Sequence, residues 1–251
     1  MRARALCLFL LALGCGRHGG DPLALEDATI RRGEYQVHNN WWGEALAIGD
    51  HEQSIFLRET GGEIVFGWDW SWVGTGVVAY PNVFFGASPF EPRRTTSRLP
   101  MRNGASRITA QFEILTEASG TWNTAFDLFF TATPSGRRTH EVMIWTDGGG
   151  GMQPAGELVG TLDAGGVTYD LFWEPEMDLA EYGWPENFRY AAYRAREPVR
   201  SGPLDLGLFI DDLLARGYLP ADGYLACIGF GNEVILGAGH TEVANYAIEI
   251  E

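Results

Sequence analysis

The chain consists largely of short runs of β-branched and aromatic residues separated by Gly, Pro, Asn and Asp, and this pattern constrains its fold most. The runs cover residues 34–42, 54–58, 63–72, 77–86, 107–115, 125–132, 142–146, 167–173 and 188–194, with similar patterning over 223–236 and 243–250. Short strands at near-regular spacing are typical of an antiparallel β-sandwich or barrel. With 251 residues, of which 45% are hydrophobic, the chain can bury one large core, so we predict a single all-β domain.

One segment departs from the strand pattern. Within residues 204–217, apolar side chains recur at three- and four-residue spacing, namely Leu206, Phe209, Ile210, Leu213 and Leu214. This spacing predicts one amphipathic helix, which Gly217 ends.

The N-terminus predicts export. Residues 1–16 combine a basic start, an apolar run and Gly14-Cys15-Gly16, which is typical of a secretion signal and too short to span a membrane. The tetrapeptide at 12–15 also resembles a bacterial lipoprotein processing box, so lipidation at Cys15 and ordinary cleavage both remain open. Residues 17–33 have little periodicity and are predicted to be a linker. We expect a secreted protein, either free or lipid-anchored to the bacterial envelope, with its folded domain over 34–251.

Charge and cysteine content exclude several classes. The formal charge is −15, which disfavours binding to a nucleic-acid backbone. Outside the signal region Cys227 is the one cysteine, so no internal disulfide framework is available. The histidines show no spacing that favours a metal site, and we expect a monomer.

Two glutamates lie among apolar strand residues. In an extended strand the segment 140–145 points Glu141, Met143 and Trp145 to one face. Glu233 lies in the apolar segment 224–237. Glycoside cleavage needs one ionised and one protonated carboxyl group across the scissile bond, and this pair is a candidate for both.

A third acidic residue lies in a strand that should face a core. Period-2 geometry places Asp127 on one face with Asn123, Ala125 and Phe129. Asp127 is either satisfied by backbone donors or lies beside Glu141 and tunes its ionisation.

Tryptophans provide candidate sugar platforms. Asn40 and Trp42 share one face, and Trp68, Trp70 and Trp72 share another. Flat rings stack on sugars, although burial is the commoner fate of Trp. We expect Trp42 and one of the later three to contact a ligand.

These segments together resemble glycoside hydrolase family twelve, the small jelly-roll endoglucanases and xyloglucanases. The matching stretches are 35–43, 68–70, 79–83, 123–130, 141–145, 154–156, 190–193, the late helix and the strand of Glu233, over nearly all of 34–251. The Glu-Val-Met-Ile-Trp motif at 141–145, followed by Pro154, is fairly specific.

The resemblance implies a concave cleft and a role for each matched residue. The implied residues are Glu141 as nucleophile, Glu233 as general acid/base, Asp127 as helper, Asn40 and Asn123 as substrate contacts, Trp42 as stacking ring, and Met143, Trp145 and Pro154 as further cleft residues. It also implies a retaining double displacement through a covalent glycosyl-enzyme, without metal or organic cofactor.

The chain also departs from the family pattern. The segment 231–235 lacks the aromatic usual near the acid/base, the loop 134–139 is short, and residues 174–185 read as an insertion. The leading hypothesis is a secreted endo-β-1,4-glucanase that acts on cellulose, mixed-linkage glucan or xyloglucan. The alternative is a non-catalytic carbohydrate-binding sandwich, which would need the rings but not both glutamates.

Overall fold

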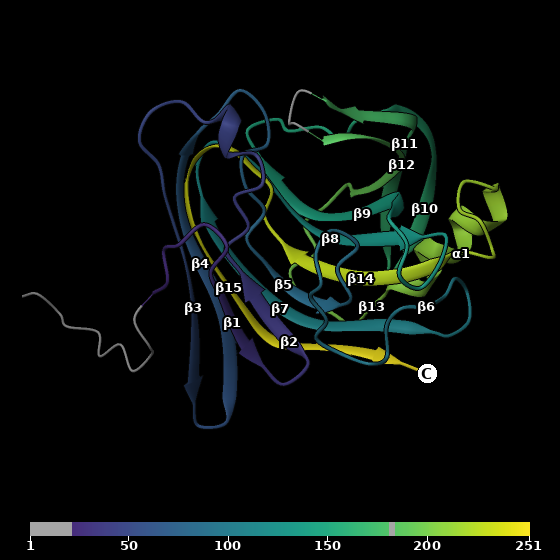
Figure 1. Ribbon diagram of the computed structural model, residues 1–251, viewed down its shortest axis with the longest axis horizontal. Helices are drawn as coiled ribbons and strands as arrows, with labels where there is room; N and C mark the ends of the chain where they lie inside the picture. The colour runs from purple at the N-terminus through teal and green to yellow at the C-terminus, as the bar shows by residue number, and fades with distance from the viewer. Residues whose placement is uncertain (1–21, 181–183) are drawn as a thin grey trace, which may run out of the picture.

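The computed structural model describes residues 22–180 and 184–251, and strands dominate them (Figure 1). The strands are β1 (Thr29–Arg32), β2 (Tyr35–His38), β3 (Glu52–Thr60), β4 (Glu63–Val73), β5 (Asn82–Gly86), β6 (Met101–Arg102), β7 (Ile108–Ala118), β8 (Thr121–Thr131), β9 (Arg138–Gly149), β10 (Glu157–Ala164), β11 (Val167–Leu179), β12 (Trp184–Ala195), β13 (Leu204–Asp205), β14 (Tyr224–Gly231) and β15 (Val234–Ile250). A 3-10 turn, η1 (Glu44–Leu46), and a helix, α1 (Leu206–Arg216), complete the described elements.

The strands form two layers that share one hydrogen-bonded network. One layer has the order β1-β2-β5-β14-β8-β9-β12-β11-β10, and the other contains β3, β4, β15, β7 and β13. β15 joins the layers where Val234 pairs with Trp122 and Leu236 with Thr121. The strand pairs are antiparallel except β9 with β12, which run parallel. The predicted jelly-roll sandwich is confirmed.

The core lies between the layers because each strand alternates its side chains. On β8, Phe126 is fully buried in the core, whereas Asp127 belongs to the opposite face and lines a cleft. The ring of Phe126 stacks on Phe230 of β14 at a centroid distance of 4.0 Å, and Phe112 of β7 meets Phe230 edge-on at 5.0 Å. Aromatic burial therefore holds the two layers together beneath the cleft.

The three tryptophans of β4 lie in this core. Trp68, Trp70 and Trp72 are 0%, 3% and 1% exposed. β4 belongs to the layer that does not carry the cleft, and the face that the three side chains share packs into the core. The expectation that one of them contacts a ligand is therefore wrong.

Helix α1 confirms the predicted amphipathic segment. Its N-cap Asp205 accepts a hydrogen bond from the backbone N–H of Gly207 at 3.0 Å, and Gly217 ends it with a φ of 74°. Leu206, Phe209 and other apolar residues of its inner face are buried. No helix in the described ranges is both long and apolar enough to cross a membrane.

The N-terminal boundary differs from the prediction. Residues 29–32, assigned to the linker, form β1 and pair with β2. This edge strand is mostly exposed, so it has no hydrophobic alternation by which sequence could reveal it. The predicted signal 1–16, with Cys15, lies outside the described residues. Cys227 is a buried free thiol.

Candidate active site

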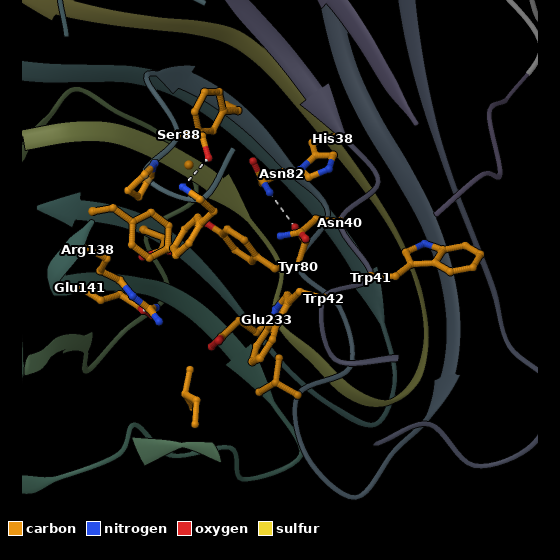
Figure 2. A pocket seen from close by; sticks show the side chains of 18 of the residues that line it. His38, Asn40, Trp41, Trp42, Tyr80, Asn82, Ser88, Arg138, Glu141 and Glu233 are labelled. Atoms are coloured by element: carbon orange, nitrogen blue, oxygen red, sulfur yellow. Dashed lines mark hydrogen bonds and ion pairs between the residues drawn. The ribbon is translucent and has the colours of Figure 1, made fainter. Parts of the chain in front are cut away.

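A cleft of about 740 Å³ lies over the exposed face of β5, β14, β8, β9 and β12. Six of the sequence-predicted site residues line it, namely Asn40, Trp42, Asp127, Glu141, Trp145 and Glu233. Figure 2 shows Glu141 beside Arg138 on one wall, with Glu233 and Trp42 nearer the centre. The structure thus brings both candidate catalytic glutamates into one cavity.

Glu141 lies in β9 and is paired with a buried cation. Nη1 of Arg138 donates to its Oε2 at 2.5 Å, and the side chains are only 7% (Arg138) and 13% (Glu141) exposed. Burial raises the pKa of Glu141 above its usual value, and the charge and hydrogen bond of Arg138 bring it part of the way back down. The guanidinium therefore favours the ionised form that a nucleophile needs.

A β-bulge explains why Arg138 reaches Glu141. Phe130 pairs with His140 but Thr131 pairs with Arg138, so β9 carries one extra residue at this point. Arg138 consequently shares the cleft face with Glu141, although strict alternation would send it to the core.

Glu233 follows β14 and is held by Asn123 of β8. Nδ2 of Asn123 donates to Oε2 of Glu233 at 2.5 Å. Oδ1 of Asn123 accepts from the backbone N–H of Glu233 at 3.0 Å. Desolvation, followed by the charge of Glu141, raises the pKa of Glu233 to about 8, and the bond from Asn123 opposes this. Glu233 therefore carries a proton at neutral pH, as a general acid must.

Asn232 anchors the turn that carries Glu233. This fully buried side chain accepts from Trp68 Nε1 at 2.8 Å and Thr241 Oγ1 at 2.9 Å. It donates to the Asn123 carbonyl at 2.9 Å and to Thr124 Oγ1 at 2.8 Å. Sequence showed Asn232 only as a departure from the family pattern, yet its saturated amide ties the acid to both layers.

Asp127 is buried in the cleft floor. Desolvation, then the charges of Glu141 and Glu233, raise its pKa well above the usual range, and Arg138 opposes them. Its Oδ1 is buried without a hydrogen-bond partner. Both observations favour a neutral carboxyl group, since an unpaired buried charge is costly.

Three predicted contact residues do not line the cleft. Asn123 is 0% exposed and occupied by Glu233. Met143 is 1% exposed, and its sulfur accepts from Tyr190 Oη at 3.3 Å and Trp145 Nε1 at 3.5 Å. Pro154 is buried, while its neighbours Gln153 and Ala155 do line the cleft.

The cleft also contains residues that sequence reasoning had not assigned to the site. They include His38, Tyr80, Asn82, Phe90, Arg138, Met177, Leu179 and Tyr190. His38, Tyr80, Asn82 and Tyr190 belong to stretches already matched to the family, and that match was the signal that could have found them. The others come from loops or from the irregular start and end of strands, which have no period to follow.

The arrangement matches one chemistry. One carboxyl group is paired with a cation, a second holds a proton across the same cleft, and a tryptophan lines it. Two carboxyl groups in opposite protonation states on one cleft are what glycoside hydrolysis requires, so the site is that of a glycoside hydrolase.

Comparison with known proteins gives the family. The model of glycosyl hydrolase family 12 matches residues 33–251. The chain therefore belongs to that family, and it is a glycoside hydrolase.

Individual relatives and solved structures are consistent with this family assignment. Endoglucanase S of Pectobacterium parmentieri is 26% identical over 229 residues, covering 87% of this chain and 82% of that protein. The xyloglucan-specific endo-beta-1,4-glucanase A of Emericella nidulans is also 26% identical over 229 residues, with 88% of each covered. The family 12 xyloglucanase of Bacillus licheniformis superimposes with a TM-score of 0.82 at 22% identity, over 92% of this chain and 100% of that one. That likeness supports the fold.

Proposed function

We propose that this chain is a secreted, retaining endo-β-1,4-glucanase that hydrolyses internal β-1,4-glucosyl bonds of cellulose, mixed-linkage glucan or xyloglucan. One observation carries the proposal: Glu141 lies against a guanidinium at 2.5 Å while Glu233 in the same cleft has a pKa raised to about 8. The names of the relatives, an endoglucanase and a xyloglucan-specific endoglucanase, support the substrate class.

The first step forms a glycosyl-enzyme. A carboxylate oxygen of Glu141 attacks the anomeric carbon, while Glu233 donates its proton to the departing glycosidic oxygen. The C–O bond to the leaving chain breaks as the bond to Glu141 forms. Asp127, kept neutral by burial, adds no charge that would oppose ionisation of Glu141.

The second step releases the sugar. Glu233, now ionised, takes a proton from water, and the water oxygen attacks the anomeric carbon. The bond to Glu141 breaks and its carboxylate is restored. Two displacements at one carbon retain the anomeric configuration.

Substitutions of the two glutamates test these roles. Glu141→Gln should abolish hydrolysis and remain folded, because it removes only the nucleophilic charge. Glu233→Ala should slow activated aryl glycosides less than polysaccharide, because a good leaving group needs little proton donation. Glu117→Gln, on the exposed face of β7, is the control and should be unaffected. Near-normal turnover by Glu141→Gln would contradict the assignment.

Asp127 has a separate test. Asp127→Asn should weaken activity without erasing it and should shift the acidic limb of the pH profile, because the charge of Glu141 raises the pKa of Asp127, and the substitution removes this second carboxyl group that competes with Glu141 for a proton. An unchanged profile would return Asp127 to a structural role. The non-catalytic alternative is not favoured, since a binding module needs no second glutamate.

For the preferred glucan, we propose that xyloglucan is accepted at least as well as linear mixed-linkage glucan. Ile235 lines the cleft where the family usually has a larger ring, which leaves room for pendant xylose. Met177 and Leu179 of the inserted segment also line the cleft. Their side chains narrow it and so disfavour a branched substrate. Specificity constants on xyloglucan and barley β-glucan decide the matter; poor cleavage of xyloglucan would show that the narrowing dominates.

Export is part of the proposal. The apolar run and Cys15 support either a cleaved signal or a lipid anchor. Fractionation of cells that express the wild type or Cys15→Ser distinguishes the lipid anchor from the cleaved signal. An anchored protein moves from the membrane to the medium on substitution, whereas a freely secreted protein is found in the medium in both cases. Retention of both proteins in the cytoplasm would refute export.

A further inference from the structure

Arg138 occupies an unusual position for an arginine. Its side chain is 7% exposed, and its guanidinium carbon lies 3.5 Å from the ring centroid of Phe188. The rings of Phe90 and Phe129 lie at 5.1 and 5.6 Å. Rings from β8, β12 and the loop after β5 thus surround one cation, and its hydrogen bond goes to Glu141.

The other cations of the cleft lining are not available to the carboxyl groups. Arg93 is ion-paired with Glu91 and lies 4.8 Å from the centroid of Phe84. Desolvation, helped by Arg93, lowers the pKa of His38 to about 3, so His38 is neutral at working pH. Among the described lining residues, Arg138 is the cation that contacts a catalytic carboxyl group.

Charge balance gives this contact a function. Asp127, Glu141 and Glu233 share one buried region, and a charge on one carboxyl group makes it harder to ionise another. One guanidinium can compensate one carboxylate, so the favoured state has one ionised carboxyl group and two neutral ones.

The remaining titratable groups near Glu141 stay neutral. Desolvation raises the pKa of Tyr80, Tyr190 and Cys227 well above their usual ranges. His140, on the opposite face of β9, has its pKa lowered to about 4 by burial and then by Arg189. Among the described groups whose pKa values are linked to the charge of Glu141, Asp127 and Glu233 are therefore the ones that exchange protons with it between these limits.

We propose that Arg138 is a positioning residue that selects Glu141 as the ionised carboxyl group of this site and leaves Asp127 and Glu233 protonated. The inference rests on the proposed double displacement, in which nucleophile and acid need opposite protonation states. The stacked rings hold the guanidinium on Glu141 and keep water away, which strengthens the pairing.

The proposal predicts a narrowed pH profile when Arg138 is removed. Without the cation the pKa of Glu141 rises, so the acidic limb of kcat/KM moves upward by about 1 to 3 pH units. Glu233 still loses its proton only after Glu141 is ionised, so it feels the full charge of Glu141 as before, and the basic limb stays in place while the profile narrows from its acidic side. A loss of packing alone would lower the whole profile without moving either limb.

The experiment compares Arg138→Met, Arg138→Lys and a matched control. Arg98→Met is the control, because Arg98 also lies over a ring, Phe85 at 4.7 Å, and pairs with a carboxylate, Glu34 at 2.9 Å, but does not line the cleft. The profiles are measured on an activated aryl cellobioside, with thermal unfolding alongside. Arg138→Met should narrow the profile and Arg138→Lys should narrow it less, since the ammonium keeps the charge. The control should not change either limb.

Trapping of the covalent glycosyl-enzyme tests the double displacement separately from the role of Arg138. An activated 2-deoxy-2-fluoro cellobioside should label Glu141 of the wild type, as peptide mass spectrometry would show. Labelling with unmoved pH limbs in folded Arg138→Met, or in the uncharged Arg138→Gln if the first variant does not fold, overturns the role of Arg138 alone. Absence of labelling at Glu141 in the wild type overturns the double displacement itself.

Discussion

Asn123 and Glu233 are joined by three hydrogen bonds. The Asn123 amide donates to Glu233 Oε2 at 2.5 Å, its Oδ1 accepts from the Glu233 N–H at 3.0 Å, and the Asn123 N–H donates to the Glu233 carbonyl at 3.0 Å. The side chain and backbone of the acid are thus fixed to β8, which also carries Asp127. A single buried amide orients the group that must reach the glycosidic oxygen.

Asn123→Ala should therefore lower kcat more than it raises KM. The carboxyl group loses its orientation, and loss of a hydrogen bond to a neutral carboxyl group costs about 0.5 to 1.5 kcal/mol, or about 2- to 13-fold in rate. Because the bond from Asn123 lowers the pKa of Glu233, the basic limb should also move upward. Asn123→Asp is a poor substitute, since it adds a carboxyl group beside Glu233. Unchanged kcat with a raised KM would instead indicate that Asn123 contacts substrate.

The raised pKa of Glu233 predicts a stability cost. The folded group titrates at about 8 and the unfolded one at 4.5. Between these values the unfolded chain has lost the proton that the folded chain keeps, so stability is full below pH 4.5 and falls as pH rises towards 8. Because the carboxyl group faces an open cleft, the loss is at most about 4 kcal/mol. Glu233→Gln should thus unfold at a higher temperature than the wild type at pH 8 and at a similar one at pH 4. Parallel curves for both proteins across that range would argue against a buried protonated Glu233.

Two glycines of β14 make a matched pair of steric tests. A Cβ added at Gly231 would lie 2.0 Å from the Pro81 carbonyl oxygen, whereas one at Gly229 would lie 3.2 Å from Cε1 of Tyr80. Gly231→Ala should destabilise the fold by about 1 to 3 kcal/mol or more, because backbone must move. Gly229→Ala should be tolerated better, because a side chain can shift. Chemical denaturation of both variants measures this, and equal losses would contradict it.

Sequence predicts most of this fold because its signals are periodic. The alternation of Glu141, Met143 and Trp145 placed these residues on one strand face, and the 3.6-residue spacing of Leu206 to Leu213 located α1. β10 was missed because Glu157–Ala164 is a mostly exposed edge strand with weak alternation.

The site was harder to predict where periodicity fails. Arg138 reaches the cleft through a bulge, which shifts the alternation by one residue and leaves no mark in the sequence. Trp68 and Trp72 have the composition of a sugar platform but hydrogen-bond to Asn232 and Gln53 inside the core. Which layer a strand joins depends on long-range pairing, and local sequence does not specify it.

Trp42, the predicted stacking ring, lines the cleft near Glu233 (Figure 2). If its ring stacks on a glucosyl unit, Trp42→Ala should raise KM for polysaccharide by about tenfold, because one aromatic contact contributes about 1.5 kcal/mol. The kcat value should change little, since stacking acts on substrate and transition state alike. Trp42→Phe keeps a smaller ring, so its KM should lie between those of the wild type and Trp42→Ala. Trp173 is the control: its ring stacks on Tyr218 at 4.4 Å and lies outside the cleft lining, so Trp173→Phe should leave KM nearly unchanged. A fall in kcat at constant KM for Trp42→Ala would show that the ring orients the reacting bond and does not serve as a uniform binding platform.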